Sequence, residues 1–133
     1  RSYVTAVVSI DLENVGNWAK KRGISFTTFQ DLSQRSEVYE LIQAEIKKIN
    51  ERFPENIRIK RFTILLKPMH PDDGELTRTR KVRRKFVNER YQALIEDLYQ
   101  PDTQDHNLDI EIRYEDGRIS TFSGTVGIEE VYS

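Results

Sequence analysis

The fold is decided by the stretch SEVYELIQAEIKKINERFPENIRIKRFTILL, residues 36–66, because it holds a helical pattern followed by a strand pattern. In its first half the apolar side chains recur at steps of three and four residues, which is the period of an amphipathic helix. They are Val38, Leu41, Ile42, Ile46, Ile49 and Phe53. Pro54 stops this helix. Residues 57–66 then predict a strand, whose apolar phase shifts between Ile59 and Phe62 and so indicates a bulge or burial on both faces.

Further elements are expected before this stretch. Residues 3–10 are apolar and β-branched, which predicts a largely buried strand. Asp11 is suited to cap a helix that runs to about Lys21, and Gly23 is suited to end it. A short helix is expected over residues 29–32. The chain thus alternates strand and helix from its first residues.

Beyond the central stretch the pattern continues to the end of the chain. Residues 67–80 are polar and contain two prolines and a glycine, so we expect a long loop of the kind that is often functional. Residues 82–99 predict a third long helix. Alternation over residues 110–114 precedes Asp116-Gly117, which predicts a β-hairpin with a type I′ turn. The expected fold is α+β: one domain, residues 1–133, with a small mixed β-sheet, about three packed helices and a C-terminal β-hairpin.

Composition narrows the classes of function. The chain has 133 residues, a net charge of −1, 37% apolar and 32% charged residues, and no cysteine. Thiol nucleophiles, thiolate zinc sites and disulfide scaffolds are excluded, and a cytoplasmic location is expected. No apolar run approaches the roughly 20 residues of a membrane helix. Since the chain begins at Arg1 without Met, we expect an excised piece of a longer protein.

One segment has an unusual charge pattern. Six cations lie within residues 78–85, which we call the basic segment: Arg78, Arg80, Lys81, Arg83, Arg84 and Lys85. They straddle the start of a predicted helix, where cations oppose the helix dipole and where backbone N–H groups suit a phosphate. The segment therefore predicts an anion site, with a solvated basic face as the alternative. Binding of nucleic acid or anionic lipid is a second alternative, although no aromatic residue within the segment could stack on bases.

Other catalytic patterns are lacking in the sequence. His70 and His106 are far apart and stand without further ligands at metal-binding spacing, so no metal site is expected. No serine has the context of a nucleophile elbow, and no glycine-rich phosphate loop occurs. The chain therefore holds no complete catalytic constellation of its own.

The basic segment overlaps a motif that resembles the last conserved motif of AMP-forming long-chain fatty acyl-CoA synthetases. The matching residues are Gly74-Glu75-Leu76-Thr77, Thr79, Lys81, Arg83 and Arg84. The flanks agree in the same order; they are Tyr3-Val4-Thr5-Ala6, Glu45-Ile46-Lys47-Lys48-Ile49-Asn50, Ile59-Lys60-Arg61-Phe62 and Tyr114-Glu115-Asp116-Gly117-Arg118. Arg78 replaces the family's usual proline, which adds charge to the loop.

This resemblance implies a function. The parent enzyme would be a ligase that uses ATP, Mg²⁺ and CoA to convert a fatty acid first to acyl-AMP and then to acyl-CoA. The chain would be its C-terminal lid domain, inactive alone and lacking the upstream hinge and the large nucleotide-binding domain that is its partner. The parent enzyme would be cytoplasmic or peripheral to the membrane.

The resemblance also implies roles for residues of the loop. Lys81 matches the catalytic lysine of the family. Gly74, Glu75, Thr77 and Thr79 would shape the loop, and Arg83, Arg84 and Lys85 would contact phosphates of CoA or the missing domain. The alternative remains a non-enzymatic module that binds nucleic acid or anionic lipid through the basic segment.

Overall fold

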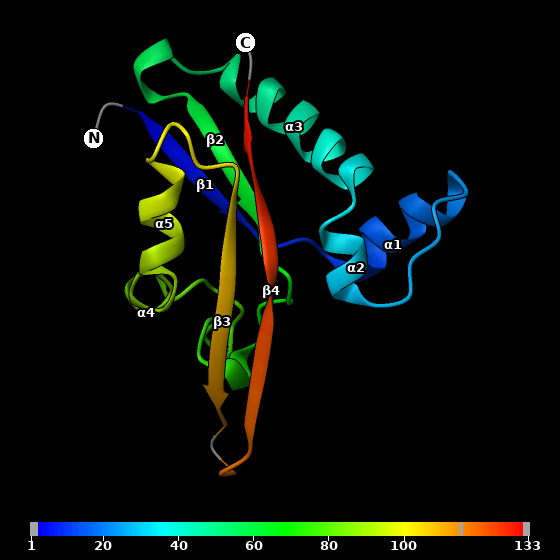
Figure 1. Ribbon diagram of the computed structural model, residues 1–133, viewed down its shortest axis with the longest axis vertical. Coiled ribbons are helices and arrows are strands. Elements are labelled where there is room, and N and C mark those ends of the chain that lie inside the picture. Colours follow the sequence, from blue (N-terminus) through cyan, green and yellow to red (C-terminus); the bar gives the residue numbers. More distant parts are fainter. Residues whose placement is uncertain (1–2, 115, 132–133) are drawn as a thin grey trace.

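A four-stranded mixed sheet forms the centre of the computed structural model, which describes residues 3–114 and 116–131 (Figure 1). The strands are β1 Val4–Val8, β2 Ile59–Ile64, β3 Asp105–Arg113 and β4 Ile119–Glu130. Their order is β1-β2-β4-β3; β1 and β2 are parallel, and the other neighbours are antiparallel. The α+β class predicted from the sequence is confirmed.

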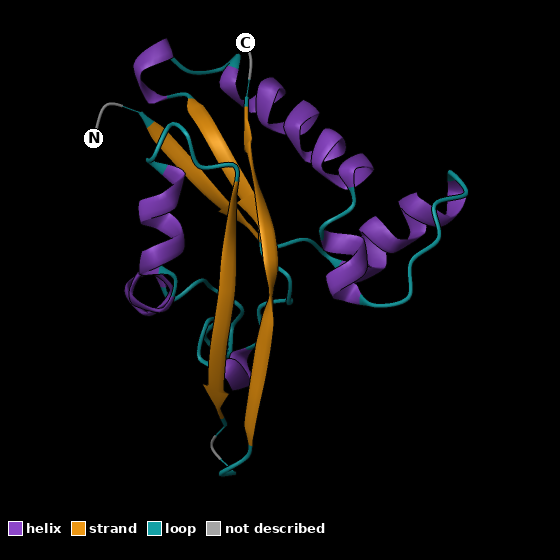
Figure 2. Ribbon diagram, in the orientation of Figure 1, coloured by secondary structure: helices purple, strands orange, loops and turns teal. Residues whose placement is uncertain are grey.

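Helices cover both faces of the sheet (Figure 2). The α-helices are α1 Leu12–Lys21, α2 Phe29–Ser33, α3 Ser36–Asn50, α4 Arg84–Arg90 and α5 Gln92–Leu98, and the 3₁₀ turns are η1 Glu55–Ile57 and η2 Pro71–Asp73. Helices α1 to α3 lie on one face, and α4 and α5 lie on the other.

The two faces have separate apolar cores, because successive side chains of a strand point to opposite sides. On β1, Ala6 and Val8 pack with the core under α1 to α3, whereas Val7 packs with the core under α4 and α5. Leu94 and Val126 are fully buried in the second core. This second core supports the loop that carries the basic segment.

Several expectations about individual elements are corrected. Strand β1 is a half-exposed edge strand and is not largely buried, since only β2 pairs with it. Helix α3 ends at Asn50, so Phe53 lies beyond it; Ile49 and Phe53, at the end of the predicted stripe, are 46% and 45% exposed. The sequence predicted either a bulge or burial on both faces for β2, and both occur. Most of β2 is buried, and its register with β1 shifts between Val4 and Thr5.

The predicted helix over residues 82–99 is broken. It begins at Arg84 and divides at Tyr91, so that α4 is seen nearly end-on in Figure 1 while α5 lies in the plane. Together with the short α2, this break gives five α-helices among the described residues, instead of about three. The side chain of Tyr91 is buried, and its position at the break proves important for the site.

The C-terminal hairpin is confirmed, but its turn differs from the prediction. The Gly117 N–H donates to the Tyr114 carbonyl at 3.0 Å, and the Tyr114 N–H donates to the Arg118 carbonyl at 2.9 Å. Gly117 has a φ of +88°. Because Tyr114 pairs with Arg118, more than two residues separate the paired ones, so the two-residue type I′ assignment is wrong. Glu115, which the prediction for this turn included, lies outside the described residues.

Candidate active-site loop

The basic segment begins in a closed turn. Leu76 and Val82 form an isolated antiparallel bridge, and the Arg83 N–H donates to the Glu75 carbonyl at 2.9 Å. Two strand-like pairs therefore hold the base of the turn at residues 77–81, which we call the Lys81 turn. The loop that the sequence predicts over residues 67–80 is ordered by these bonds, although much of it is exposed.

Threonines close the turn from within. The Thr77 N–H donates to the Lys81 carbonyl at 2.8 Å, and the Lys81 N–H donates to Thr77 Oγ1 at 3.0 Å. Thr77 Oγ1 also lies 3.1 Å from Thr79 Oγ1. Arg80 takes a left-handed φ of +65° and donates its N–H to the Thr77 carbonyl at 2.9 Å. The Thr77 hydroxyl, at the first residue of the turn, thus bonds the last residue, and its loss would leave the Lys81 N–H without this acceptor.

Gly74 precedes the turn in a position that only glycine fits. Its φ is +83°, a conformation that L side chains rarely adopt, and a Cβ there would lie 3.0 Å from the Phe86 ring. The guanidinium of Arg83 lies 5.1 Å from the centroid of that ring, and that of Arg90 lies 4.5 Å from it. Arg83 also donates to the Gly74 carbonyl at 3.1 Å. The aromatic ring therefore fixes the chain entering the turn.

Beneath the turn lies a set of buried ionisable side chains, which we call the buried charge network: Lys67, Asp73, Glu75, Arg90 and Tyr91. Lys67 Nζ donates to Asp73 Oδ2 at 2.7 Å and to Glu75 Oε1 at 2.6 Å. Arg90 donates to Glu75 Oε2 at 2.9 Å, and the Tyr91 hydroxyl donates to the same oxygen. Lys67, Asp73, Glu75 and Tyr91 are at most 4% exposed.

The network is satisfied and balanced in charge. The third donor of the Lys67 ammonium bonds the Pro68 carbonyl at 2.8 Å, and Asp73 Oδ1 accepts the Glu75 N–H at 2.9 Å. Two cations face two carboxylates. Burial raises the pKa of Tyr91, and the nearby Glu75 carboxylate raises it further, so the phenol stays protonated and donates. Full pairing is what makes burial of four charges tolerable.

The side chain of Lys81, unlike those of the buried charge network, lies in solvent. Within residues 3–114 and 116–131 its ammonium makes no hydrogen bond or ion pair. The turn thus combines an immobilised backbone with a cation that remains available for an anion. Arg84 and Lys85 are exposed in the first turn of α4, and Arg83 is partly engaged by Gly74.

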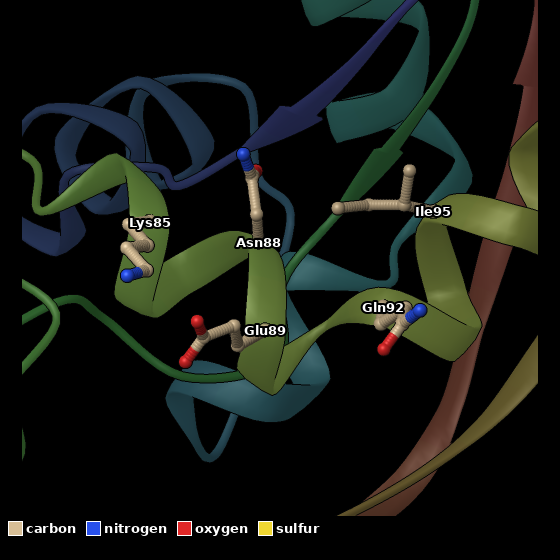
Figure 3. Close-up of a pocket in the computed structure, with 5 residues that line it drawn as sticks. All are labelled: Lys85, Asn88, Glu89, Gln92 and Ile95. Carbon is tan, nitrogen blue, oxygen red and sulfur yellow. The ribbon is translucent and has the colours of Figure 1, made fainter.

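The side chain of Lys85 lies over a separate open hollow of about 650 Å³ (Figure 3). Lys85, Asn88 and Glu89 of α4 and Gln92 and Ile95 of α5 line it. Among the described residues that line this hollow, Lys85 is the one cation, and it shares the hollow with the Glu89 carboxylate. Lys81 is not one of these five residues.

Neither a cluster of metal ligands nor a membrane-spanning helix is found in the described part of the chain. No group of three or more histidine, aspartate or glutamate side chains there could hold a metal ion. No helix among these residues is both long enough and apolar enough to cross a bilayer.

Comparison with known proteins places this loop in a family. The family model described as the AMP-binding enzyme C-terminal domain matches residues 25–103, more than half of the chain. The chain belongs to this family. The matched region of the AMP-binding enzyme C-terminal domain contains the Lys81 turn and the whole buried charge network.

Individual relatives agree with the family. The chain is 33% identical over 99 residues, 74% of its length, to a Mycobacterium tuberculosis protein named as a fatty-acid–CoA ligase, fadD11, of which it covers 17%. It is 30% identical over 100 residues to the long-chain-fatty-acid–CoA ligase FadD15 of the same species, again with 74% and 17% covered. It is 31% identical over 85 residues, 62% of its length, to the chicken long-chain-fatty-acid–CoA ligase ACSBG2, of which it covers 11%.

These relatives are much longer than the chain, which spans about a sixth of the bacterial proteins. No solved structure matches this AMP-binding enzyme C-terminal domain.

Sequence reasoning missed four members of the network beneath the turn: Lys67, Asp73, Arg90 and Tyr91. One signal was available, since Tyr91 lies on the inward face of a predicted helix and a buried tyrosine hydroxyl needs a partner. The partner itself could not be inferred, because Glu75 is 16 residues away in sequence.

Proposed function

We propose that this AMP-binding enzyme C-terminal domain is the lid of a long-chain fatty acid:CoA ligase and supplies Lys81 to the adenylation step. The observation that carries the proposal is the exposed ammonium on a turn whose base is held by buried ion pairs. Relatives named as long-chain-fatty-acid–CoA ligases support the substrate class.

The first half-reaction explains why a lysine is useful there. A carboxylate oxygen of the fatty acid attacks the α-phosphorus of ATP, the bond from that phosphorus to the bridging oxygen breaks, and pyrophosphate leaves. Two anions approach each other, and negative charge builds on the phosphate oxygens. The Lys81 ammonium, carried on a turn whose backbone is fixed by hydrogen bonds, offsets that charge.

The second half-reaction requires a different surface. The CoA thiol loses its proton to solvent and attacks the acyl carbonyl, the bond to the phosphate oxygen of AMP breaks, and AMP leaves. We expect the lid to rotate between the steps and carry Lys81 away. Arg83, Arg84 and Lys85 are the candidates for contacts with phosphates of CoA or with the large domain, and their exposure leaves them accessible.

The remaining components belong to the partner in this proposal. ATP, the fatty acid and Mg²⁺ would be held by the large adenylation domain. The residues described here supply no group of metal ligands, so the contribution of this chain is positional and electrostatic. The chain alone is expected to form no acyl-AMP.

Replacing Lys81 tests the proposal. In the full-length ligase, Lys81→Ala should slow pyrophosphate release by about 10²-fold or more, as the loss of one preorganised stabilising group does elsewhere. Production of acyl-CoA from synthetic acyl-AMP and CoA should survive. Lys48→Ala removes another exposed lysine, paired with Glu45 on α3, and is the matched control with unchanged rates in both steps.

Two outcomes would contradict this assignment. Equal losses in both half-reactions would mean general damage or a different role, and wild-type rates in both would remove Lys81 from the mechanism. If the isolated chain instead bound oligonucleotides or anionic vesicles with a strong dependence on salt, the basic segment would be a binding surface.

A further inference from the structure

Every other member of the buried charge network bonds Glu75, which lies at the base of the Lys81 turn. Lys67, Arg90 and Tyr91 donate to the carboxylate of Glu75, and Asp73 accepts its backbone N–H. These four come from the loop that follows β2, from η2 and from the junction of α4 and α5. Three parts of the fold therefore fix the position of Glu75.

Glu75 passes this constraint directly to the turn. Its carbonyl accepts the Arg83 N–H at 2.9 Å, and its neighbour Leu76 forms the bridge with Val82. Any displacement of the Glu75 backbone therefore moves both pairs that close the turn. Because its side chain is fully buried, such a displacement would also separate charges in a site without water to replace their partners.

We propose that the buried charge network positions the Lys81 ammonium for adenylation, with Arg90 as the positioning residue contributed by α4; this rests on the proposed function of the loop. Arg90 contacts Glu75 at 2.9 Å, and its guanidinium lies 4.5 Å from the centroid of the Phe86 ring. That ring occupies the space beside Gly74. One side chain thus contacts Glu75 directly and also contacts the ring that lies beside Gly74.

A mechanical consequence follows. Because the turn is bonded to the sheet and to the helices, Lys81 moves with the domain as one body and does not reach its target by bending of the loop. The position of Lys81 relative to the substrate is set when the domain closes. A displacement of the base of the turn therefore displaces Lys81 as well. A misplacement of about 1 Å costs on the order of 10²-fold in rate when a reaction depends on orientation.

The first test needs no activity. In the 133-residue chain, Arg90→Met should speed amide exchange at Arg80, Lys81 and Arg83 by about tenfold and leave the β3–β4 ladder unchanged, since local opening depends on local bonds. Arg113→Met is the matched control, because Arg113 also pairs with a glutamate, Glu111, but on the exposed hairpin, and its exchange in the turn should equal that of the wild type.

The second test is kinetic. In the full-length ligase, Arg90→Met should lower kcat for adenylation about tenfold or more with little change in KM for ATP, and should spare thioester formation from supplied acyl-AMP. Arg90→Lys should recover much of the rate, because Arg90 reaches Glu75 through one nitrogen and a lysine ammonium can replace a single donor. A role limited to stability would not separate the two half-reactions.

The outcomes distinguish this proposal from the function on which it rests. Unchanged exchange in the turn of Arg90→Met, or exchange that rises equally throughout the chain, would overturn positioning. A tenfold loss confined to adenylation together with faster exchange in the turn would support it. If Lys81→Ala left adenylation intact, the proposed function would fail, while the exchange experiment would still report whether the network holds the turn.

Discussion

At the scale of single residues, a backbone angle decides what the hairpin tolerates. Gly117 lies in the hairpin turn with a φ of +88°, and nothing lies within 4 Å of a Cβ built on it. Space is therefore not limiting, and the left-handed backbone alone excludes β-branched residues.

Gly117→Val should lower the free energy of unfolding by about 1 kcal/mol or more, through strain in the turn. Chemical denaturation of both proteins measures the difference. Gly117→Asn is the informative control, because asparagine tolerates this angle better and should lose less. Equal stability of the valine variant would mean that the turn relaxes to another conformation.

Only part of the candidate site could be predicted from the sequence. The cluster of cations indicated an anion site at residues 78–85, and the resemblance of the Gly-Glu-Leu-Thr motif to that of the synthetases singled out Lys81, because both signals are local in sequence. The ion pairs that support it were not visible, since Lys67, Glu75 and Arg90 meet only after β2 and α4 have packed. Contacts between distant residues depend on the fold and carry no periodic signal.

At the scale of elements, the end of α5 depends on a buried arginine. The guanidinium of Arg61, on β2, donates to the carbonyls of Asp97, Leu98, Gln100 and Thr103, and the residue is 5% exposed. These carbonyls include the last ones of the helix, where a cation also meets the negative end of the dipole.

Arg61→Met should cost about 2 kcal/mol of stability, because several carbonyls lose a charged donor and methionine offers none. Arg58→Met provides the comparison, since Arg58 donates to one carbonyl, that of Phe53, near the surface, and should cost much less. Denaturant melts give both values. Similar losses in the two variants would indicate that Arg61 contributes through its aliphatic packing alone.

Some helices and strands could be predicted from the sequence pattern and others could not. Hydrophobic periodicity predicted α1, α3, β2 and the hairpin, since each has a strong local signal. It missed the division between α4 and α5, because the apolar spacing continues through Tyr91, whose backbone leaves the helical conformation at φ −104° and ψ 22°. It also predicted a buried β1, because composition alone does not distinguish an edge strand from a central one.

At the scale of the whole molecule, stability should depend on alkaline pH. Burial raises the pKa of both Tyr91 and Tyr39, and the Glu75 carboxylate adds to the effect at Tyr91. In the unfolded chain tyrosine ionises near pH 10, so above that pH the unfolded state binds fewer protons than the folded state. Stability contributed by these phenols is fully present below pH 10 and is lost as the pH rises further.

The free energy of unfolding should fall above pH 10, by up to about 1.4 kcal/mol per pH unit for Tyr91, and the raised pKa of Tyr39 should add to the fall. Urea melts at pH 9, 10 and 11 measure the slope. Tyr91→Phe and Tyr39→Phe should each make it shallower, whatever their stability at neutral pH. Identical slopes in the wild type and both variants would show that neither phenol is held protonated by the fold.

The exposed cations of residues 78–85 have a final consequence that concerns how partners meet. The molecule has a net charge of −1, so these cations concentrate positive charge on one segment of a nearly neutral chain. Beneath it, the paired charges of the network balance one another. An approaching polyanion would be turned toward the Lys81 side during diffusion, over distances of about a Debye length, roughly 8 Å at physiological salt. The association rate with such a partner, more than the affinity of the complex, would then decrease as the ionic strength rises.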